Sequence, residues 1–306
     1  MNYIFIVNPH ARTGLGGMTW DLIEPELKKR RIAYSTYITE KSGHAEKIAR
    51  EITADGKEHT IVVLGGDGTV NEVLNGMKDP GKITLGYIPI GSSNDFARGL
   101  GIRKEPLEAL EVVLAGKKTV ELDVGVISRN GKKRKFAVSA GIGFDAGVCH
   151  QVCISRWKIL LNKLNLGKLS YAVVALDRLI KCRPAAMSVQ VDGGKEETFQ
   201  KVYFAAFMNL PCEGGGFRFC PKALPSDGKL DLLVAADVSK LKVLLLLPVA
   251  LLGRHTGFRG VTLRRGSRIR VRSEKPLPIH TDGEPLFLRR EAEAYTGEEK
   301  IRVITG

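Results

Sequence analysis

From its start to about Val120, the chain switches repeatedly between hydrophobic residues at alternate positions and hydrophobic residues at every third or fourth position. The first pattern predicts strands at Tyr3–Val7, Ala33–Thr39, Thr60–Leu64 and Ile83–Ile88. The second predicts helices at Thr19–Arg31, Ala45–Thr53, Val70–Met77 and Pro106–Ala115. Strands that take turns with helices are typical of a parallel, doubly wound sheet, in which ligands bind at the carboxyl ends of the strands.

Beyond about Val120 the pattern changes to short alternating runs separated by Gly, Pro and Asp turns. These runs predict antiparallel strands at Phe136–Ala140, Ser188–Val191, Val202–Met208, Leu230–Val234, Arg268–Arg272 and Ile301–Ile304. Two helical inserts interrupt them, at about Ser155–Cys182 and Ser239–Leu252. We therefore predict an α/β domain over residues 1–122 and a β-sandwich with helical inserts over residues 123–289.

The composition is that of a globular protein, with 306 residues of which 43% are hydrophobic and 26% charged. The longest strongly apolar stretch, Leu241–Leu252, contains a lysine and a proline and is shorter than the ~20 residues that span a bilayer. The N-terminal residues lack the pattern of a signal peptide, so we expect a cytoplasmic protein. The five cysteines are scattered without a CxxC pair, which predicts reduced thiols, and Cys149, His150 and Cys153 offer a metal no evident fourth ligand.

A glycine turn, Gly65-Gly66-Asp67-Gly68-Thr69, directly follows the predicted strand Thr60–Leu64 and precedes a predicted helix. Glycines let a backbone approach a polyphosphate closely, and the amides at the start of the next helix point toward the anion. The carboxylate of Asp67 would contact Mg²⁺ there, directly or through water. The alternative is an ordinary connection between a strand and a helix, with Asp67 as a helix cap.

A second polar segment, Gly91-Ser92-Ser93-Asn94-Asp95, follows the predicted strand Ile83–Ile88. In a parallel sheet this segment and the glycine turn share one edge. Asp67 and Asp95 would then face a common Mg²⁺-nucleotide, with Ser92 and Asn94 as hydrogen-bond donors. Taken alone, the segment is more simply a helix N-cap.

Other nucleotide motifs are absent or incomplete. The chain has no GxxxxGK[ST] sequence, which excludes a P-loop, and no HRD or DFG element of protein kinases. Gly141–Ala146 fits the loose GxGxxA form, but no acidic residue ends a second strand about 20 residues later. The glycine turn and its neighbouring segment therefore remain the best nucleotide site.

These two segments resemble the signatures of the diacylglycerol kinase catalytic-domain family, to which sphingosine and ceramide kinases are related. The similar blocks are Gly65–Glu72 and Gly91–Arg98. Asn8-Pro9 with Arg12 and Gly14 is similar to the family's opening nucleotide loop, and Thr39 before Gly43-His44-Ala45 to another nucleotide contact. The resemblance thus implies nucleotide contacts at Asn8, Pro9, Arg12, Thr39, Gly65, Gly66, Gly68, Thr69, Asn71, Glu72, Ser92 and Asn94.

The resemblance continues in the second half of the chain. Pro221–Asp231 is similar to the family's structural magnesium loop, which implies a carboxylate ligand at Asp227 and carbonyl ligands at Leu224 and Lys229. Asp282-Gly283-Glu284-Pro285 resembles the segment that holds the family's catalytic acid, which falls on Glu284. Without the resemblance, that tetrapeptide is more simply a surface turn.

The resemblance also implies a fold and an activity. The fold is an α/β nucleotide domain like that of NAD kinase and diacylglycerol kinase plus a β-sandwich, with residues from about 290 to 306 returning to the first domain and the site between the domains. The activity is ATP- and Mg²⁺-dependent phosphorylation of a hydroxyl of diacylglycerol or a related lipid, with Glu284, Asp67 and Asp95 as catalytic residues. The alternatives are an NAD kinase and a non-catalytic protein that binds anionic lipid.

The net charge of +14 indicates a partner of negative charge. We expect reversible binding to a lipid at the anionic inner face of the membrane, and no nucleic acid because no binding module accompanies the charge; a homodimer is also allowed. An apolar stripe around Trp157 predicts an interfacial helix, with core packing as the simpler alternative. The basic residues gather in two clusters, at Arg254, Arg259, Arg264, Arg265, Arg268, Arg270 and Arg272, and at Lys132, Lys133, Arg134 and Lys135.

Overall fold

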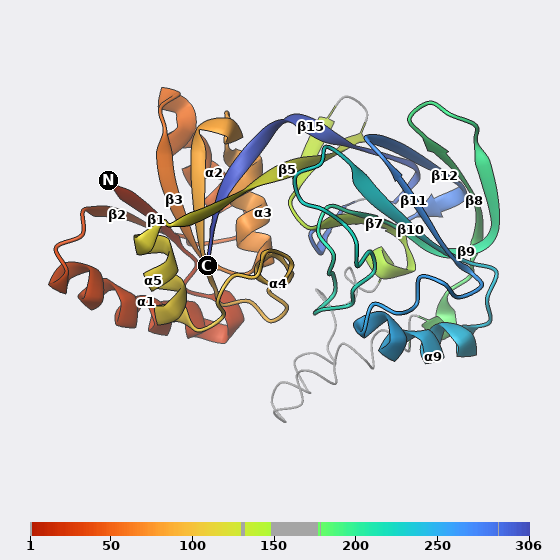
Figure 1. Ribbon diagram of the computed structural model, residues 1–306, viewed down its shortest axis with the longest axis horizontal. Helices are drawn as coiled ribbons and strands as arrows, with labels where there is room; N and C mark the ends of the chain where they lie inside the picture. The colour runs from red at the N-terminus through yellow and green to blue at the C-terminus, as the bar shows by residue number, and fades with distance from the viewer. Residues whose placement is uncertain (1, 130–131, 148–176, 178, 287) are drawn as a thin grey trace.

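The computed structural model describes residues 2–129, 132–147, 177, 179–286 and 288–306 (Figure 1). An α/β domain and a β-rich domain lie side by side in it. The predicted helical insert Ser155–Cys182, the apolar stripe around Trp157 and the group Cys149, His150 and Cys153 fall wholly or mostly outside the described residues. Among the described helices, none is both long and apolar enough to cross a membrane.

The first domain is a parallel sheet with helices on both faces. Its strands are β1 (Tyr3–Val7), β2 (Tyr34–Ile38), β3 (His59–Gly65) and β4 (Ile83–Pro89), in the order β4-β3-β1-β2. Its helices are α1 (Ala11–Lys29), α2 (His44–Ile52), α3 (Asp67–Gly76), α4 (Asp95–Leu100) and α5 (Pro106–Ala115), with short 3₁₀ turns at Thr53–Asp55 and Pro80–Lys82.

The apolar run of β3 explains why helices cover both faces of this sheet. Successive side chains of a strand point to opposite faces. Ile61 and Val63 pack in a core formed with α2 and α3, whereas Val62 and Leu64 pack in a second core formed with α1 and α5. A strand buried on both faces has no polar alternate position, which is why its sequence is continuously apolar.

Helix α1 begins eight residues before the predicted start at Thr19, at Ala11. Its first turn is not regular, because Arg12, Thr13 and Gly14 all have positive φ angles, of 47°, 60° and 95°. Gly16 lies against the end of β1, where an added Cβ would lie 2.0 Å from the carbonyl oxygen of Asn8. The glycines here allow close approach of a helix to a strand end, whereas the sequence suggested only a loop.

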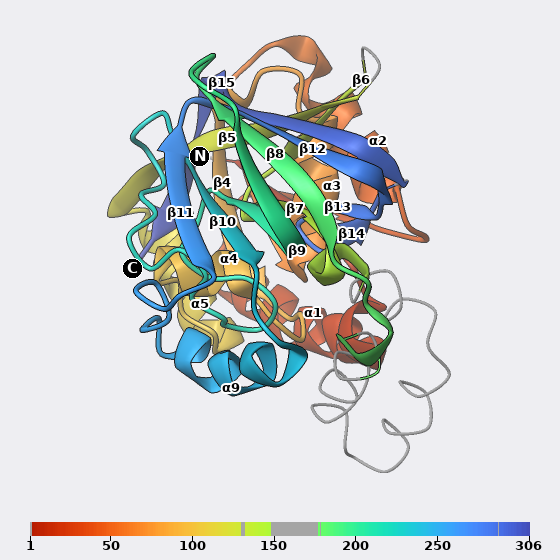
Figure 2. The ribbon, with the colours of Figure 1, turned by 90° about the vertical axis from the view of Figure 1, so that its right-hand side faces the viewer.

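The second domain is antiparallel (Figure 2). Its elements are β5 (Lys118–Arg129), β6 (Lys132–Phe136), β7 (Ser139–Gly143), β8 (Ala185–Val191), β9 (Glu197–Met208), β10 (Leu230–Ala236), α9 (Lys240–Leu251), β11 (Val261–Gly266), β12 (Arg268–Leu277), β13 (Ile279–Thr281), β14 (Glu284–Pro285) and β15 (Arg289–Thr305). One hydrophobic core is formed by side chains of β7, β8, β9, β10, β12, β13 and β15. A second core lies on the other face of β9 and β10 and includes Val243 of α9.

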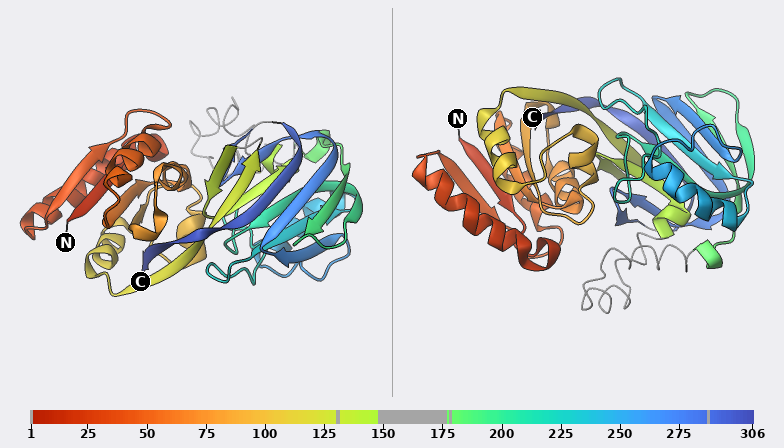
Figure 3. Two further views of the ribbon diagram at one scale, coloured as in Figure 1. Left: turned by 90° about the horizontal axis from the view of Figure 1, so that it is seen from above. Right: turned by 60° about the horizontal axis from the view of Figure 1, so that its bottom comes forward.

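Strand β15 joins the two domains. Its first half pairs with β12, and its length also pairs with β5, both antiparallel. Near its end it pairs in parallel with β4, with Arg302 opposite Thr84 and Val303 opposite Leu85. Figure 3 shows β15 running from the second domain to the C-terminus in the first. The strands therefore form one continuous hydrogen-bonded network across both domains.

Candidate active site

The two glycine-containing turns lie side by side at the carboxyl ends of β3 and β4. The amide of Ile90 donates to the carbonyl oxygen of Gly65 at 2.7 Å. A Cβ on Gly91 would lie 2.8 Å from the Cα of Gly66, so only glycine allows this approach. The shared sheet edge expected for the two segments is therefore present.

Asp67 links the two turns. Its carboxylate oxygens accept hydrogen bonds from the backbone amides of Asp95 and Phe96, each at 3.1 Å. Asp67 thus caps α4, the helix that follows the other turn, and not its own helix α3. Burial, together with the nearby charge of Asp95, raises the pKa of Asp67 to about 7. Each oxygen keeps a second lone pair, so the carboxylate fits the role of a Mg²⁺ contact.

Asp95 is directed at the second domain. Its Oδ2 accepts a hydrogen bond from the amide of Gly215 at 2.8 Å, and its Oδ1 lies 3.6 Å from Nε of Arg98. Burial raises the pKa of its carboxyl, and the charge of Glu213 adds to the effect. Asp95 therefore fastens α4 to the loop that follows β9. Its joint role with Asp67 at a metal stays a prediction.

Among the predicted nucleotide contacts, Asn8 and Thr69 meet at the carboxyl ends of β1 and β3, where Asn8 Nδ2 donates to Thr69 Oγ1 at 3.1 Å. Thr39 is buried, and its amide donates to the carbonyl oxygen of Val7 at 2.8 Å. Pro9 lies in the turn between β1 and α1, and Arg12 lies in the irregular first turn of α1. These residues surround the strand ends beside the glycine turn.

Two predicted nucleotide contacts, Glu72 and Asn71, make hydrogen bonds within the protein, and their contact with a nucleotide stays a prediction. Glu72 accepts from the hydroxyl of Ser42 and from the amides of Gly43 and Ala45, at 2.8–3.2 Å, and so holds the start of α2. Asn71, fully buried, donates to the carboxylate of Asp282 at 2.8 Å. Of the remaining predicted contacts, Ser92 is exposed and Asn94 adopts a left-handed φ of 50° just before α4.

Glu284 lies against the first glycine turn. A Cβ on Gly68 would lie 2.5 Å from Oε1 of Glu284, so the missing side chain of this glycine makes room for the carboxylate. Burial raises the pKa of Glu284, and the charge of Glu72 adds to the effect. The structure therefore brings the predicted catalytic acid of the second domain to the predicted phosphate loop of the first.

The turn that carries Glu284 is fastened by Asp282, a residue the sequence did not single out. Asp282 and Gly283 have φ angles of 48° and 82°, as in a two-residue hairpin turn between β13 and β14. The carboxylate of Asp282 accepts from the amides of Ala137, Val138 and Ser139 at 2.8–3.0 Å, besides Asn71. An Asp-Gly pair signals a hairpin turn, but nothing in the sequence indicates these distant donors.

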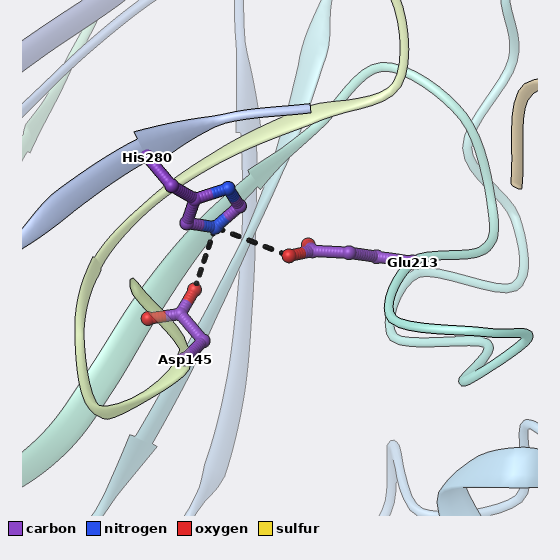
Figure 4. Close-up of side chains that lie close together, drawn as sticks. All are labelled: Asp145, Glu213 and His280. Carbon is purple, nitrogen blue, oxygen red and sulfur yellow. Dashed lines mark hydrogen bonds and ion pairs between the residues drawn. The ribbon is translucent and has the colours of Figure 1, made fainter. Parts of the chain in front are cut away.

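A second group that the sequence missed is Asp145, Glu213 and His280 (Figure 4). All three side chains are buried, and Nε2 of His280 lies 3.2 Å from Asp145 and 3.1 Å from Glu213. The amide of Gly283 donates to Nδ1 of His280 at 3.2 Å. Because an amide can only donate, Nδ1 is the acceptor and Nε2 carries the proton.

This tautomer determines what the group can do. Nε2 donates its proton toward both carboxylates, so its lone pair is not available to a metal ion. Burial raises the pKa of Asp145, whereas its hydrogen bond with His280 lowers it. The group therefore acts as a buried hydrogen-bonded cluster that joins β13, the end of β7 and the loop after β9.

The predicted structural magnesium loop is held by cations of the protein itself. Asp227 accepts from the amide of Lys229 at 3.1 Å and forms an ion pair with Arg265. Nζ of Lys300 lies 2.8 Å from the carbonyl oxygen of Ser226 and 3.2 Å from Oδ1 of Asp123. Asp227 thus has Arg265 as its ion-pair partner in this structure, and its role as a magnesium ligand with the carbonyls of Leu224 and Lys229 stays a prediction.

Comparison with known proteins agrees with this architecture. Residues 2–127 match the family model of the diacylglycerol kinase catalytic domain, and residues 137–289 match that of the YegS C-terminal NAD kinase beta sandwich-like domain. A provisionally named lipid kinase, YtlR, of Bacillus subtilis (strain 168) is 33% identical, over 92% of this chain and 93% of that protein. A diacylglycerol kinase of the same organism is 31% identical, over 82% and 78%.

Solved structures show the same fold. One described as a diacylglycerol kinase from Bacillus anthracis str. Sterne has a TM-score of 0.73 at 22% identity, over 100% of this chain and 97% of that one. An NAD kinase from Archaeoglobus fulgidus in complex with ATP has a TM-score of 0.54 at 12% identity, over 100% and 94%. The predicted α/β domain with a β-sandwich is confirmed, and the relatives' names support a lipid kinase. The chain belongs to the diacylglycerol kinase catalytic-domain family.

Proposed function

We propose that this protein is an ATP- and Mg²⁺-dependent lipid kinase that phosphorylates a hydroxyl of diacylglycerol or a related lipid. The observation that carries the proposal is the contact of Glu284 with Gly68. It brings a carboxylate of raised pKa from the second domain against the glycine turn at the end of β3. A phosphoryl donor and an acceptor hydroxyl need this arrangement, with the donor's phosphates at the turn and the acid beside them.

The chain's own residues would act mainly by alignment. Glycine backbone at Gly65, Gly66 and Gly68 gives phosphate oxygens access to the amides at the start of α3. Asp67 would hold Mg²⁺, which when bound neutralises charge on the phosphates. Glu284 would orient the lipid hydroxyl and accept its proton late in the transfer, at hydrogen-bonding distance.

The lipid acceptor implies a place of action. We expect the protein to work in the cytoplasm, at the anionic inner face of the membrane, and to bind it reversibly. The net charge of +14 supports such a surface, since each Lys or Arg near anionic lipid contributes about 1 kcal/mol.

One assay tests the proposal against its rivals. The purified protein is incubated with γ-labelled ATP, Mg²⁺ and a panel of lipids in mixed micelles, and separately with NAD as the acceptor. Label in a lipid that depends on Mg²⁺ supports the proposal. Label in NAD alone would assign the protein to NAD kinases, whose fold it shares at lower similarity. No label in any acceptor, with vesicle binding intact, would favour a lipid-binding protein without catalysis.

A further inference from the structure

Large apolar side chains are exposed along one helix of the second domain and the segment after it. Leu241, Leu245 and Leu252 are 66%, 63% and 67% exposed. In the same stretch, Leu244, Leu251 and Phe258 are 40%, 44% and 45% exposed. Single exposed leucines are ordinary, but a contiguous group marks an interaction surface.

Helix α9 has two distinct faces. Val243 and Ala250, seven residues apart, are buried, and Val243 packs on the outer core of β9 and β10. At 3.6 residues per turn, Leu241, Leu245 and Leu252 lie on the opposite side of the helix from these two. Figures 1 and 2 place α9 at the margin of the second domain, outside the strands. The solvent-exposed face of α9 is therefore apolar.

The charge of this stretch has one sign. From Ser239 to Gly260 the sequence contains no Asp or Glu and four basic residues, Lys240, Lys242, Arg254 and Arg259. The ammonium group of Lys240 donates to the backbone carbonyl of Ile180, and that of Lys242 to the backbone carbonyl of Arg259. Because these acceptors are neutral, the two bonds do not balance the positive charge of the lysines. An apolar face rimmed by cations complements a surface with an apolar interior and anionic headgroups.

In the basic cluster predicted from the sequence, the arginines of β11 and β12 have carboxylate partners. On β12, Arg270 and Arg272 share a face, and β15 places Glu293 and Glu291 opposite them. The pairs are close, at 3.0 Å for Arg270 with Glu293 and 3.1 Å for Arg272 with Glu291. Arg264 likewise pairs with Glu197. The positive charge of β11 and β12 is thus largely balanced, unlike that around α9.

An apolar cavity of about 170 Å³ lies near the start of α9. Its lining includes Phe144, Tyr203 and Pro278, together with Lys181 and Arg183. Ile180, whose carbonyl Lys240 contacts, precedes the lining residues and is 63% exposed.

We propose that α9 and residues 252–260 form the surface by which this protein docks on an anionic lipid bilayer. The proposal rests on the proposed lipid-kinase function. Helix α9 has 12 residues and is about 18 Å long, too short to cross the ~30 Å hydrocarbon core, so it lies in the interface with its leucines among the acyl chains. A second copy of this chain is a poorer occupant, because a two-fold interface would bring two patches of the same positive charge together.

Co-sedimentation with vesicles tests the docking surface. The variant carries Leu241→Gln, Leu245→Gln and Leu252→Gln, and the control carries Met18→Gln and Leu22→Gln, which alter two equally exposed side chains of α1 (66% and 65%). With vesicles of equal parts phosphatidylglycerol and phosphatidylcholine, we expect the wild type and the control to bind and the triple variant to lose at least about tenfold in affinity. Pure phosphatidylcholine vesicles should bind the wild type more weakly.

Equal vesicle binding by the wild type and the triple variant would overturn the proposal. So would sedimentation velocity that shows a wild-type dimer which the triple variant dissociates, since α9 would then be covered by a second copy. If the wild type binds vesicles through α9 but phosphorylates no lipid, the docking surface stands and the proposed function fails.

Discussion

Asp282→Asn should destabilise the protein and disturb the position of Glu284. The substitution removes hydrogen bonds but keeps the backbone conformation of the turn, so it tests the hydrogen bonds alone. Asn tolerates a left-handed conformation, so the variant keeps the turn at φ 48°. In the wild type, Oδ1 of Asp282 accepts from the amides of Val138 and Ser139, and Oδ2 accepts from the amide of Ala137 and from Asn71. In the variant, an NH₂ group replaces one of these two oxygens. Whichever oxygen it replaces, it faces two donors and can accept from neither.

The magnitude follows from the bonds that are lost. Two of the four hydrogen bonds disappear, and each bond to a charged group contributes about 1.5–3 kcal/mol, so the free energy of unfolding should fall by about 3 kcal/mol or more. Asn71 cannot compensate freely, because turning its amide would break the bond from Arg134 Nη2 to its Oδ1, at 2.7 Å. Kinase turnover should fall about tenfold or more, because Glu284 sits two residues along the same turn.

Urea unfolding and kinase assays measure both effects. The matched control is Asp237→Asn, which changes an exposed aspartate with a similar φ of 51° far along the chain from the turn. The control should unfold and turn over like the wild type. If Asp282→Asn loses no more stability than Asp237→Asn, the four hydrogen bonds do not fasten this turn and the reasoning is wrong.

The other predictions concern the acids and the loop. Glu284→Gln should lower kinase turnover on a lipid acceptor by about a hundredfold or more with an unchanged melting temperature, and near-normal turnover would remove Glu284 from its role. Asp67 binds a proton more tightly in the folded state, with a pKa of about 7, than in the unfolded state. In metal-free buffer the contribution of Asp67 to the free energy of unfolding should therefore fall as pH rises from about 4 to about 7, by roughly 1–4 kcal/mol in total. Asp67→Asn should remove this dependence on pH. Parallel curves of unfolding free energy against pH for the two proteins would contradict the reasoning. Lys300→Met should lower the melting temperature by several degrees because it leaves Asp123, 1% exposed, without its cation. The wild-type melting temperature should rise with Mg²⁺ if an ion binds at Asp227 as predicted, and equal melting curves with Mg²⁺ and with EDTA would count against that ion.

Much of the first domain follows from local sequence. The apolar run before Gly65 and the alternation of strands with helices are properties of neighbouring residues, and they were sufficient to predict a doubly wound sheet with two polar turns at one edge. Gly66 and Gly91 approach closely because parallel strands β3 and β4 end together. The formation of a strand or a helix depends on residues close together in the sequence, so the hydrophobic pattern was sufficient to predict this part of the fold.

The irregular start of α1 shows where local patterns fail within that domain. A run of glycines near Gly16 favours a loop by intrinsic propensity. In the structure this stretch is helical nevertheless, and Gly16 lies so close to the carbonyl oxygen of Asn8 that a side chain would not fit.

Only the tertiary structure decided what the acids do. Asp67 caps a helix that begins 28 residues later, Asp282 accepts from amides about 145 residues earlier, and Glu284 fills the space left by Gly68. The arginines of β12 share a face by strand geometry, but β15 decides that they meet glutamates. The sequence by itself determined the two-domain class and the phosphate-loop segments, because strand and turn formation depend on adjacent residues. The partners of buried charges depended on which distant segments the fold brings together, and no local pattern encodes that.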